Sequence, residues 1–284
     1  MTANIDSKTV EAFGQEWSRF DQTGATDAEL QKVFEQYFSI FPWESLPGNA
    51  VGFDMGCGSG RWANFVAGRV GKLNCVDASE EALAVSKSKL THHSNVECIH
   101  ASVDSLPFED ASMDFGYSLG VLHHIPNTAE GIKSCVQKLK SGAPFLIYLY
   151  YAFDNRPAWF RLIWRVSELF RRLVSALPFR IKRLVTDLIA LTIYFPLAKI
   201  ALFAEKGGLR VEALPLSTYR THSFYTMRTD ALDRFGTRLE QRFTREEIKE
   251  MMESAGLENV TISSETPYWC AVGVRSNKDL LVAQ

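Results

Sequence analysis

The stretch that decides the fold is DMGCGSGR, residues 54–61, and it directly continues the short apolar run 49–54. Three glycines alternate with other residues within it. Glycine tolerates positive φ angles and lets a ligand approach the backbone closely. Because residues 61–70 then have a helical pattern, the stretch predicts a strand, a glycine turn and a helix whose N-terminus faces a ligand.

A second acidic residue indicates a nucleoside ligand. Asp77 ends the next apolar run, about 20 residues after Gly56, where a carboxylate can accept hydrogen bonds from two ribose hydroxyls. The GxGxxG pattern of nicotinamide-binding folds would need a glycine where Arg61 stands. A tight turn without a ligand is the alternative. It is less favoured because Asp54, the alternate glycines and Asp77 occur together.

Strand-like and helix-like runs alternate along the first half of the chain. This order implies parallel strands joined by right-handed crossovers, which is an α/β doubly wound sheet. Ligands bind such sheets beyond the carboxyl ends of the strands. The expected strands are 49–54, 72–77, 95–100, 113–119 and 143–151, and the expected helices are 61–70, a run capped by Ser79, and 129–139.

The sheet pattern resumes near the end of the chain. Thr244 and Glu247 form a capping box for a helix that ends at Ala255, and residues 259–264 and 267–274 predict two antiparallel edge strands. The long interval before them must carry its own structure. We therefore expect a helical N-terminal cap (1–48), a sheet domain (49–151 and 242–284) and a helical insertion (152–241).

Composition bounds the class of protein. The chain has 284 residues, 46% hydrophobic and 23% charged, with a net charge of −2, so no basic excess indicates a nucleic-acid partner. Its five cysteines form no CxxC pair and its start lacks the pattern of a secretory signal, which predicts no metal site and a cytoplasmic protein. The best candidate for a membrane span, residues 188–198, is short and contains Pro196, so we expect no span.

With these motifs the sequence resembles the class I S-adenosylmethionine-dependent methyltransferases of the methyltransferase domain 11 type, over about residues 50–151 and again from about Phe243. The resemblance implies a Rossmann-like seven-stranded sheet in the order 3-2-1-4-5-7-6, with strand 7 antiparallel and a helical insertion after strand 5. It also implies an enzyme that uses S-adenosylmethionine.

The resemblance assigns the cofactor residues one by one. The glycine loop would wrap the methionine part of the cofactor, Asp77 would hold the ribose, and the Leu106-Pro107-Phe108 segment would line the adenine. Ser102 stands where the family often has an acid. The N-terminal stretch that begins at Phe13 and ends at Phe20 would cover the site with Trp17, although Trp17 and Phe20 could instead only pack the helix to the sheet. The implied cofactor residues are Asp54, Gly56, Cys57, Gly58, Gly60, Asp77, Ala78, Ser102, Val103, Leu119 and Trp17.

Two histidines follow the fourth strand in a segment similar to the family's LHH motif. Methyl transfer from a sulfonium needs mainly alignment and exclusion of water, and a base only if the acceptor arrives protonated. His123 and His124 are the candidates for this base because histidine titrates near working pH. The alternative, favoured for at least one of the two, is that the ring only packs or shapes the pocket.

Residues after the fifth strand are the candidates for binding the acceptor. Tyr150 and Asp154 leave its carboxyl end, and Arg220, Tyr225 and Arg228 lie in a polar and aromatic run of the insertion. Forked guanidinium groups suit a carboxylate or phosphate, which predicts an anionic small-molecule acceptor. An Arg–Asp network that fastens the insertion to the sheet domain is an equal alternative.

The insertion also contains a basic amphipathic segment. Residues 161–183 hold seven basic side chains and one acidic one, and Phe160, Ile163, Phe170 and Val174 fall on one helical face. We expect a lid helix that packs this face on the core with its arginines in solvent. Contact with an anionic membrane surface is the less favoured alternative.

The predicted function is methyl transfer from S-adenosylmethionine to oxygen or nitrogen of a small-molecule acceptor by in-line displacement. Two alternatives stay open. One is an interfacial methyltransferase of a lipid or quinone-type substrate, and the other is a catalytically silent protein that binds the cofactor.

Overall fold

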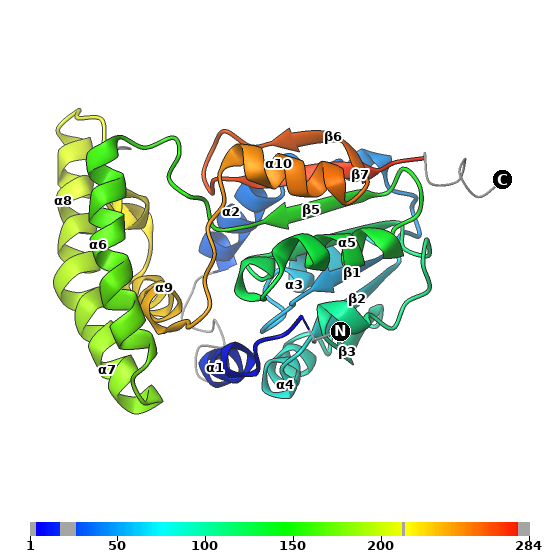
Figure 1. Ribbon diagram of the computed structural model, residues 1–284, viewed down its shortest axis with the longest axis horizontal. Helices are drawn as coiled ribbons and strands as arrows, with labels where there is room; N and C mark the ends of the chain where they lie inside the picture. The colour runs from blue at the N-terminus through cyan, green and yellow to red at the C-terminus, as the bar shows by residue number, and fades with distance from the viewer. Residues whose placement is uncertain (1–3, 18–26, 212–213, 278–284) are drawn as a thin grey trace. The chain divides into compact units, whose positions relative to one another are not determined.

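The computed structural model describes residues 4–17, 27–211 and 214–277 (Figure 1). The chain divides into two compact units. The first comprises residues 1–21, 31–152 and 239–284, and the second comprises residues 22–30 and 153–238. The first unit contains the sheet and the second is helical, so the two are described in turn.

The first unit is built on a seven-stranded sheet in the order β3-β2-β1-β4-β5-β7-β6, as predicted. β1 to β5 pair in parallel, while β7 runs antiparallel to both β5 and β6. The predicted doubly wound α/β class is therefore confirmed. The strands are β1 (Val51–Met55), β2 (Lys72–Asp77), β3 (Val96–His100), β4 (Phe115–Leu119), β5 (Pro144–Tyr148), β6 (Leu257–Ile262) and β7 (Cys270–Arg275).

Helices connect these strands, and their starts follow local capping rules. Ser79 accepts a hydrogen bond from the amide of Ala82 at the start of α4, and Thr244 and Glu247 form the predicted capping box of α10. The helices are α1 (Ser7–Trp17), α2 (Asp27–Tyr37), α3 (Ala63–Ala67), α4 (Glu80–Lys89), α5 (Thr128–Lys138) and α10 (Arg245–Ser254), with 3₁₀ turns η1 (Trp43–Ser45), η2 (Val103–Ser105) and η3 (Leu122–His124).

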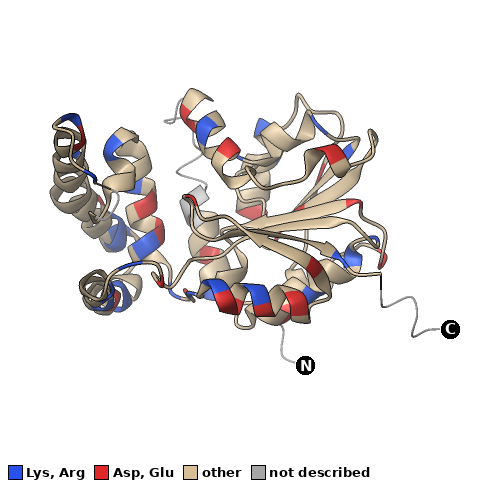
Figure 2. Cartoon of the chain, turned by 90° about the horizontal axis from the view of Figure 1, so that it is seen from above, with Lys and Arg blue, Asp and Glu red and all other residues tan. Residues whose placement is uncertain are grey.

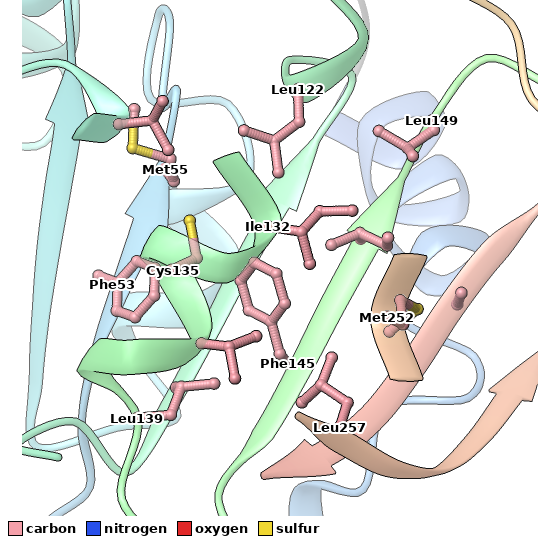
Figure 3. Close-up of a cluster of buried hydrophobic side chains, with 14 of the residues drawn as sticks. Phe53, Met55, Leu122, Ile132, Cys135, Leu139, Phe145, Leu149, Met252 and Leu257 are labelled. Atoms are coloured by element: carbon pink, nitrogen blue, oxygen red, sulfur yellow. The ribbon is translucent and has the colours of Figure 1, made fainter. Parts of the chain in front are cut away.

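Alternate side chains of the strands fill two apolar clusters. Figure 3 shows the first, in which Phe53 of β1 and Phe145 of β5 lie among Ile132 of α5 and Met252 of α10. The second cluster contains Phe34, Phe38 and Trp62 together with Phe115 and Tyr117 of β4. Large apolar side chains are thus buried by the sheet and its helices, which holds the carboxyl ends of the strands in a fixed arrangement.

The second unit is a set of packed helices. They are α6 (Ala158–Ser175), α7 (Phe179–Ile189), the π-helical turn η4 (Ala190–Tyr194), α8 (Phe195–Lys206), η5 (Ser217–Thr221) and α9 (Phe224–Gly236). α9 packs against α6, α7 and η4, and α8 packs against η5. The predicted helical insertion therefore has its own structure.

The expectation that Pro196 interrupts the apolar segment 188–198 is wrong. α7, η4 and α8 form one continuous helix from Phe179 to Lys206, because Pro196 lies in the first turn of α8 directly after a π-helical turn. Within the described part of the chain, this is the helix whose length and mean hydropathy would suffice to cross a membrane. Length and composition alone are weak evidence for a span.

The expectation that α6 packs its predicted apolar face is correct only in part, since Val174 of that face is buried. Ile163 and Phe170 are 53% and 57% exposed, whereas Arg171 on the opposite face is buried. Arg171 donates hydrogen bonds to Glu168 and to the backbone carbonyls of Thr237 and Arg238. The paired Glu168 and Arg171 therefore lie on the inward side of α6, while Arg161, Arg165 and Arg172 are exposed, as expected.

Candidate functional site

A cavity of about 940 Å³, including its open mouth, lies at the carboxyl ends of β1, β2 and β4. This is the edge where ligands bind doubly wound sheets. The glycine loop, the end of β2, η2, the β4–η3 turn and the N-terminal segment contribute its walls. The sequence-predicted residues that line it are Gly56, Cys57, Gly58, Asp77, Ala78, Ser102, Val103, Leu119 and His124.

The glycine loop needs its glycines for conformation. Gly56, Gly58 and Gly60 have φ angles of 79°, 53° and 74°, a region that side chains with a Cβ rarely adopt. A Cβ on Gly56 would lie 2.4 Å from both γ-methyl carbons of Val121. Gly60 does not line the cavity but packs against α4. The turn therefore brings bare backbone to the cavity wall.

Asp77 lines the cavity at the end of β2. Its Oδ2 accepts a hydrogen bond of 2.8 Å from the amide of Gly58, and its Oδ1 accepts one of 2.9 Å from the amide of Ser79. Burial raises the pKa of this carboxyl, and the amides of Ser79 and Gly58 offset part of the rise. The carboxylate is therefore held in one orientation, with further lone pairs available to a ligand.

Asp54 does not line the cavity. It is buried in β1 directly before the loop, and its Oδ2 has no hydrogen-bond partner. Burial raises the pKa of Asp54 to about 8, while the nearby Tyr117 hydroxyl works in the opposite direction. The structure thus places Asp54 beneath the glycine loop, without direct access to the cavity.

The segment after β3 contributes two of the predicted adenine-side residues. Ser102 and Val103 line the cavity at the start of η2. The Ser102 hydroxyl donates to the carboxylate of Asp104, and the other oxygen of Asp104 accepts from the amide of Asn4 at 2.9 Å. An acid thus stands two residues after the position where the family often has one.

The N-terminal segment forms a wall that the sequence prediction located only in part. Asn4, Asp6, Thr9 and Phe13 line the cavity, whereas the prediction began at Phe13. Asp6 accepts a hydrogen bond from the amide of Thr9 at the start of α1, so an Asp N-cap was the available signal. The Trp17 side chain lies outside the described residues. Gly120, which the resemblance also implied beside Leu119, lines the cavity, and further lining residues that were not predicted include Ser59, Arg61, Trp62, Val121 and Ile125.

The structure separates the two candidate bases. His124 lines the cavity, and its Nδ1 lies 2.6 Å from the carbonyl oxygen of Leu239, which assigns the hydrogen to Nδ1 and the basic lone pair of the neutral ring to Nε2. His123 is fully buried and does not line the cavity. Burial, followed by the charges of His124 and Arg242, lowers the pKa of His123 well below its usual value. Only His124 is placed to meet an acceptor.

Tyr150 supports His123 and does not reach the cavity lining. Its ring centroid lies 3.9 Å from that of His123, and the guanidinium of Arg242 lies 4.9 Å from the Tyr150 ring. The predicted role of Tyr150 in contacting the acceptor is therefore not supported by its position behind His123.

The arginines expected to bind the acceptor are engaged within the second unit. Arg220 makes a two-pronged pair with Glu205, and Arg228 makes one with Asp187, with both N–O distances 2.9 Å in the second pair. Both arginines therefore form ion pairs of the kind that the alternative predicts, but these pairs join parts of the insertion to each other and not to the sheet domain. Asp154 and Tyr225 also lie in this unit and have polar or ring contacts.

Comparisons with known proteins match part of the sheet unit to methyltransferases. Residues 53–147 match the methyltransferase domain family. The demethylmenaquinone methyltransferases of Bacillus licheniformis and Staphylococcus aureus are 28% and 33% identical to the chain over 102 and 93 residues. These matches cover 34% and 31% of this chain but only 44% and 38% of those proteins. The chain therefore aligns with less than half the length of either relative.

A solved structure supports the fold alone. A protein of Bordetella parapertussis described as a possible exported protein matches 89% of this chain and 70% of its own, with a TM-score of 0.52 and 12% identity. The sheet order confirms the predicted Rossmann-like fold, and residues 53–147 are similar to a methyltransferase domain, a class of domain that takes S-adenosylmethionine.

The residues of the cavity fit this cofactor. Two hydroxyl groups on the wall, Thr9 Oγ1 and Ser59 Oγ, are buried without a hydrogen-bond partner. Buried polar groups are normally paired, so such atoms point to a polar ligand. The bare loop backbone and the carboxylate of Asp77 suit the amino-acid and ribose parts. Within the described residues, no group of three or more His, Cys, Asp or Glu could hold a metal ion.

Proposed function

We propose that the chain is an S-adenosylmethionine-dependent methyltransferase that acts on a small-molecule acceptor. The observation that carries this proposal is the cavity between the positive-φ glycine loop and Asp77. The family match of residues 53–147 supports it. A turn without a ligand would not require bare backbone, a fixed carboxylate and unpaired hydroxyls around one cavity.

The chain contributes positioning more than covalent chemistry. When bound, S-adenosylmethionine supplies a methyl group activated by a sulfonium. The glycine loop would hold the amino-acid part of the cofactor and Asp77 the ribose, and the N-terminal segment around Thr9 and Phe13 would cover it and exclude water. His124 Nε2 accepts the proton of an acceptor that arrives as O–H or N–H. The cofactor would give its methyl group to the acceptor atom and become S-adenosylhomocysteine.

Calorimetry with S-adenosylhomocysteine tests the proposal directly. We expect the full chain to bind it, and Asp77→Asn to weaken binding roughly tenfold, because a neutral amide accepts ribose hydrogen bonds less strongly. Asp110→Asn is the matched control, since Asp110 is an exposed partner of Lys138 outside the cavity. Folded protein that gives no heat with either the cofactor or its product would contradict the proposal.

A lipid-soluble acceptor is the second candidate within this function. Two observations favour it over the anionic acceptor predicted from Arg220 and Arg228. Both arginines are already paired with carboxylates, and the relatives with the matching domain are named for a quinone substrate. We therefore propose a lipid or quinone-type acceptor ahead of a polar anion.

Labelled methyl transfer distinguishes the two acceptor classes. The protein is incubated with methyl-labelled S-adenosylmethionine and either a lipid extract or the aqueous metabolites of the same cells. A lipid-soluble acceptor places the label in the organic phase, whereas a polar acceptor places it in the aqueous phase. Label in neither phase, with cofactor binding intact, would favour the catalytically silent alternative.

The proposal includes a reducing compartment and no nucleic-acid partner. All five cysteines are free thiols, which is typical of cytoplasmic proteins. The net charge of −2 also argues against a general affinity for nucleic acid. Cell fractionation that includes the membrane fraction would test the location.

A further inference from the structure

The helical unit has an unusual distribution of apolar side chains. Within the described residues, every exposed large apolar side chain lies between Trp159 and Phe224, all in the second unit. The described residues of the sheet unit include none. Exposed apolar patches beyond the usual size mark interaction sites, so this surface needs a partner.

α6 carries the clearest part of this surface. Seven exposed apolar residues recur at spacings of three and four and therefore form one stripe along the helix. We call these residues the α6 stripe. They are Trp159, Leu162, Ile163, Val166, Leu169, Phe170 and Leu173.

The opposite side of α6 is polar and fully engaged. Glu168 pairs with Arg171 at 2.6 Å and with Arg234 of α9 at 3.4 Å. Burial acts to raise the pKa of Glu168, but the two arginines outweigh this effect and hold the pKa below its usual value. Glu168 and Arg171 therefore have ion-pair partners inside the unit, and this inward orientation of α6 leaves neither charge buried without a partner.

The helix formed by α7, η4 and α8 repeats this arrangement. Its inward side has Lys182, Thr186 and small residues such as Ala190 and Ala198, whereas Leu184 and Phe203 are 71% and 69% exposed. Lys182 donates a hydrogen bond of 2.9 Å to the carbonyl of Gly236. Small and polar residues inside with large apolar residues outside is the reverse of a water-soluble bundle and is typical of helices that contact lipid.

Cationic residues flank the α6 stripe along one edge. Arg161, Arg165 and Arg172 are spaced by four and seven residues, so they form a row beside the stripe. All three are exposed, and no ion pair of Arg161 or Arg165 occurs within the described residues. Figure 2 colours the basic residues blue and the acidic ones red. The single carboxylate of α6, Glu168, points inward.

We propose that the α6 stripe and the apolar side of α7 and α8 dock on the surface of an anionic lipid bilayer, with the arginine row at the phosphate headgroups. An apolar face with a cationic edge is the pattern of an interfacial helix. Each basic residue near an anionic surface adds favourable attraction. The proposal does not depend on the methyltransferase function.

The charge pattern also selects lipid over a second copy of the chain. Two copies joined through this face would bring their arginine rows close together without carboxylates between them, which is unfavourable. A helix pair that spans the bilayer would instead bury the three exposed arginines of α6 in hydrocarbon, which is costly. Docking at the surface satisfies both the apolar stripe and its cationic edge.

Vesicle co-sedimentation of the full chain tests this proposal. We expect binding to phosphatidylcholine vesicles that contain about 30% phosphatidylglycerol, weak binding to phosphatidylcholine alone, and a several-fold loss of bound protein in about 0.5 M salt. Tryptophan emission should shift to the blue on binding. Trp159→Phe should remove most of that shift while leaving co-sedimentation intact.

Two pairs of variants separate the contributions. Leu162→Gln with Leu169→Gln should lower the vesicle affinity roughly tenfold or more, whereas Leu162→Met with Leu169→Met keeps the stripe apolar and should preserve it. Arg161→Glu with Arg165→Glu should lower the affinity for anionic vesicles roughly tenfold. Lys133→Glu with Lys249→Glu makes the same charge change on the sheet unit and should have little effect.

Three results would overturn the proposal. The first is folded protein that stays in the supernatant with anionic vesicles at low salt. The second is a dimer that dissociates in the Leu→Gln variant but does not bind vesicles, which would assign the face to a second copy. The third is binding that resists salt and alkaline washing and ignores the arginine reversal, which would indicate a helix inserted across the bilayer.

Discussion

The two units of this chain differ in which groups they leave without partners. The sheet unit buries its large apolar side chains and leaves two buried hydroxyl groups on the cavity wall, Thr9 Oγ1 and Ser59 Oγ, without a hydrogen-bond partner. The helical unit pairs Arg171 with Glu168 and leaves large apolar side chains exposed. Buried polar atoms without hydrogen-bond partners indicate that the sheet unit binds a small polar ligand. An exposed apolar face indicates that the helical unit docks on an apolar partner surface.

The strongest test of the sheet unit is the glycine loop. Gly56→Ala should weaken S-adenosylhomocysteine binding by roughly a hundredfold or more, because a Cβ there is strained at positive φ and would clash with Val121. Calorimetry measures the affinity. Gly68→Ala is the control, since Gly68 has an ordinary helical φ and open space around it. Equal affinity in both variants would show that the loop is not the cofactor site.

The next largest effect should separate the two histidines. His124→Ala should lower kcat roughly a hundredfold with an acceptor that must lose a proton, because its ring lines the cavity. His123→Ala should mainly lower thermal stability, because that ring is buried against Tyr150. Steady-state rates at several pH values and thermal melts measure these effects. Full turnover by His124→Ala would exclude it as the base.

The buried carboxyl of Asp54 predicts that the stability of the folded chain depends on pH. Its pKa is raised to about 8 in the folded chain, so between the unfolded value near 4 and about 8 the folded state holds a proton that the unfolded state has lost. The free energy of unfolding should therefore fall as pH rises through this window, by on the order of 1.4 kcal/mol per pH unit. Asp54→Asn should flatten that slope in urea unfolding. An equally steep slope in the variant would assign the effect elsewhere.

The smallest effect is expected from the paired arginines of the helical unit. Arg228→Gln removes the pair with Asp187, which is partly exposed, so the free energy of unfolding should fall by less than about 1 kcal/mol. Cofactor affinity and the acceptor KM should not change. A large increase in KM with unchanged stability would restore Arg228 to acceptor binding.

Much of the sheet unit could be predicted because its signals are local. The glycines of residues 56–60, the capping residue Ser79 and the box of Thr244 with Glu247 each determine the backbone near them. Asp77 was located because the strand before it ends where its apolar run ends. The separation of His124 from His123 could not be read from adjacent positions, since it depends on Tyr150 and Leu239, far away in the chain.

For the helical unit, the sequence by itself determined that the segment is helical and amphipathic, because these properties follow from residue periodicity. Only the tertiary structure decided which face points inward. Periodicity is the same for a helix with its apolar face buried and for one with that face exposed. The choice was made by distant partners, in particular Arg234 near Glu168 and Gly236 near Lys182, which satisfy the polar side of each helix within the unit.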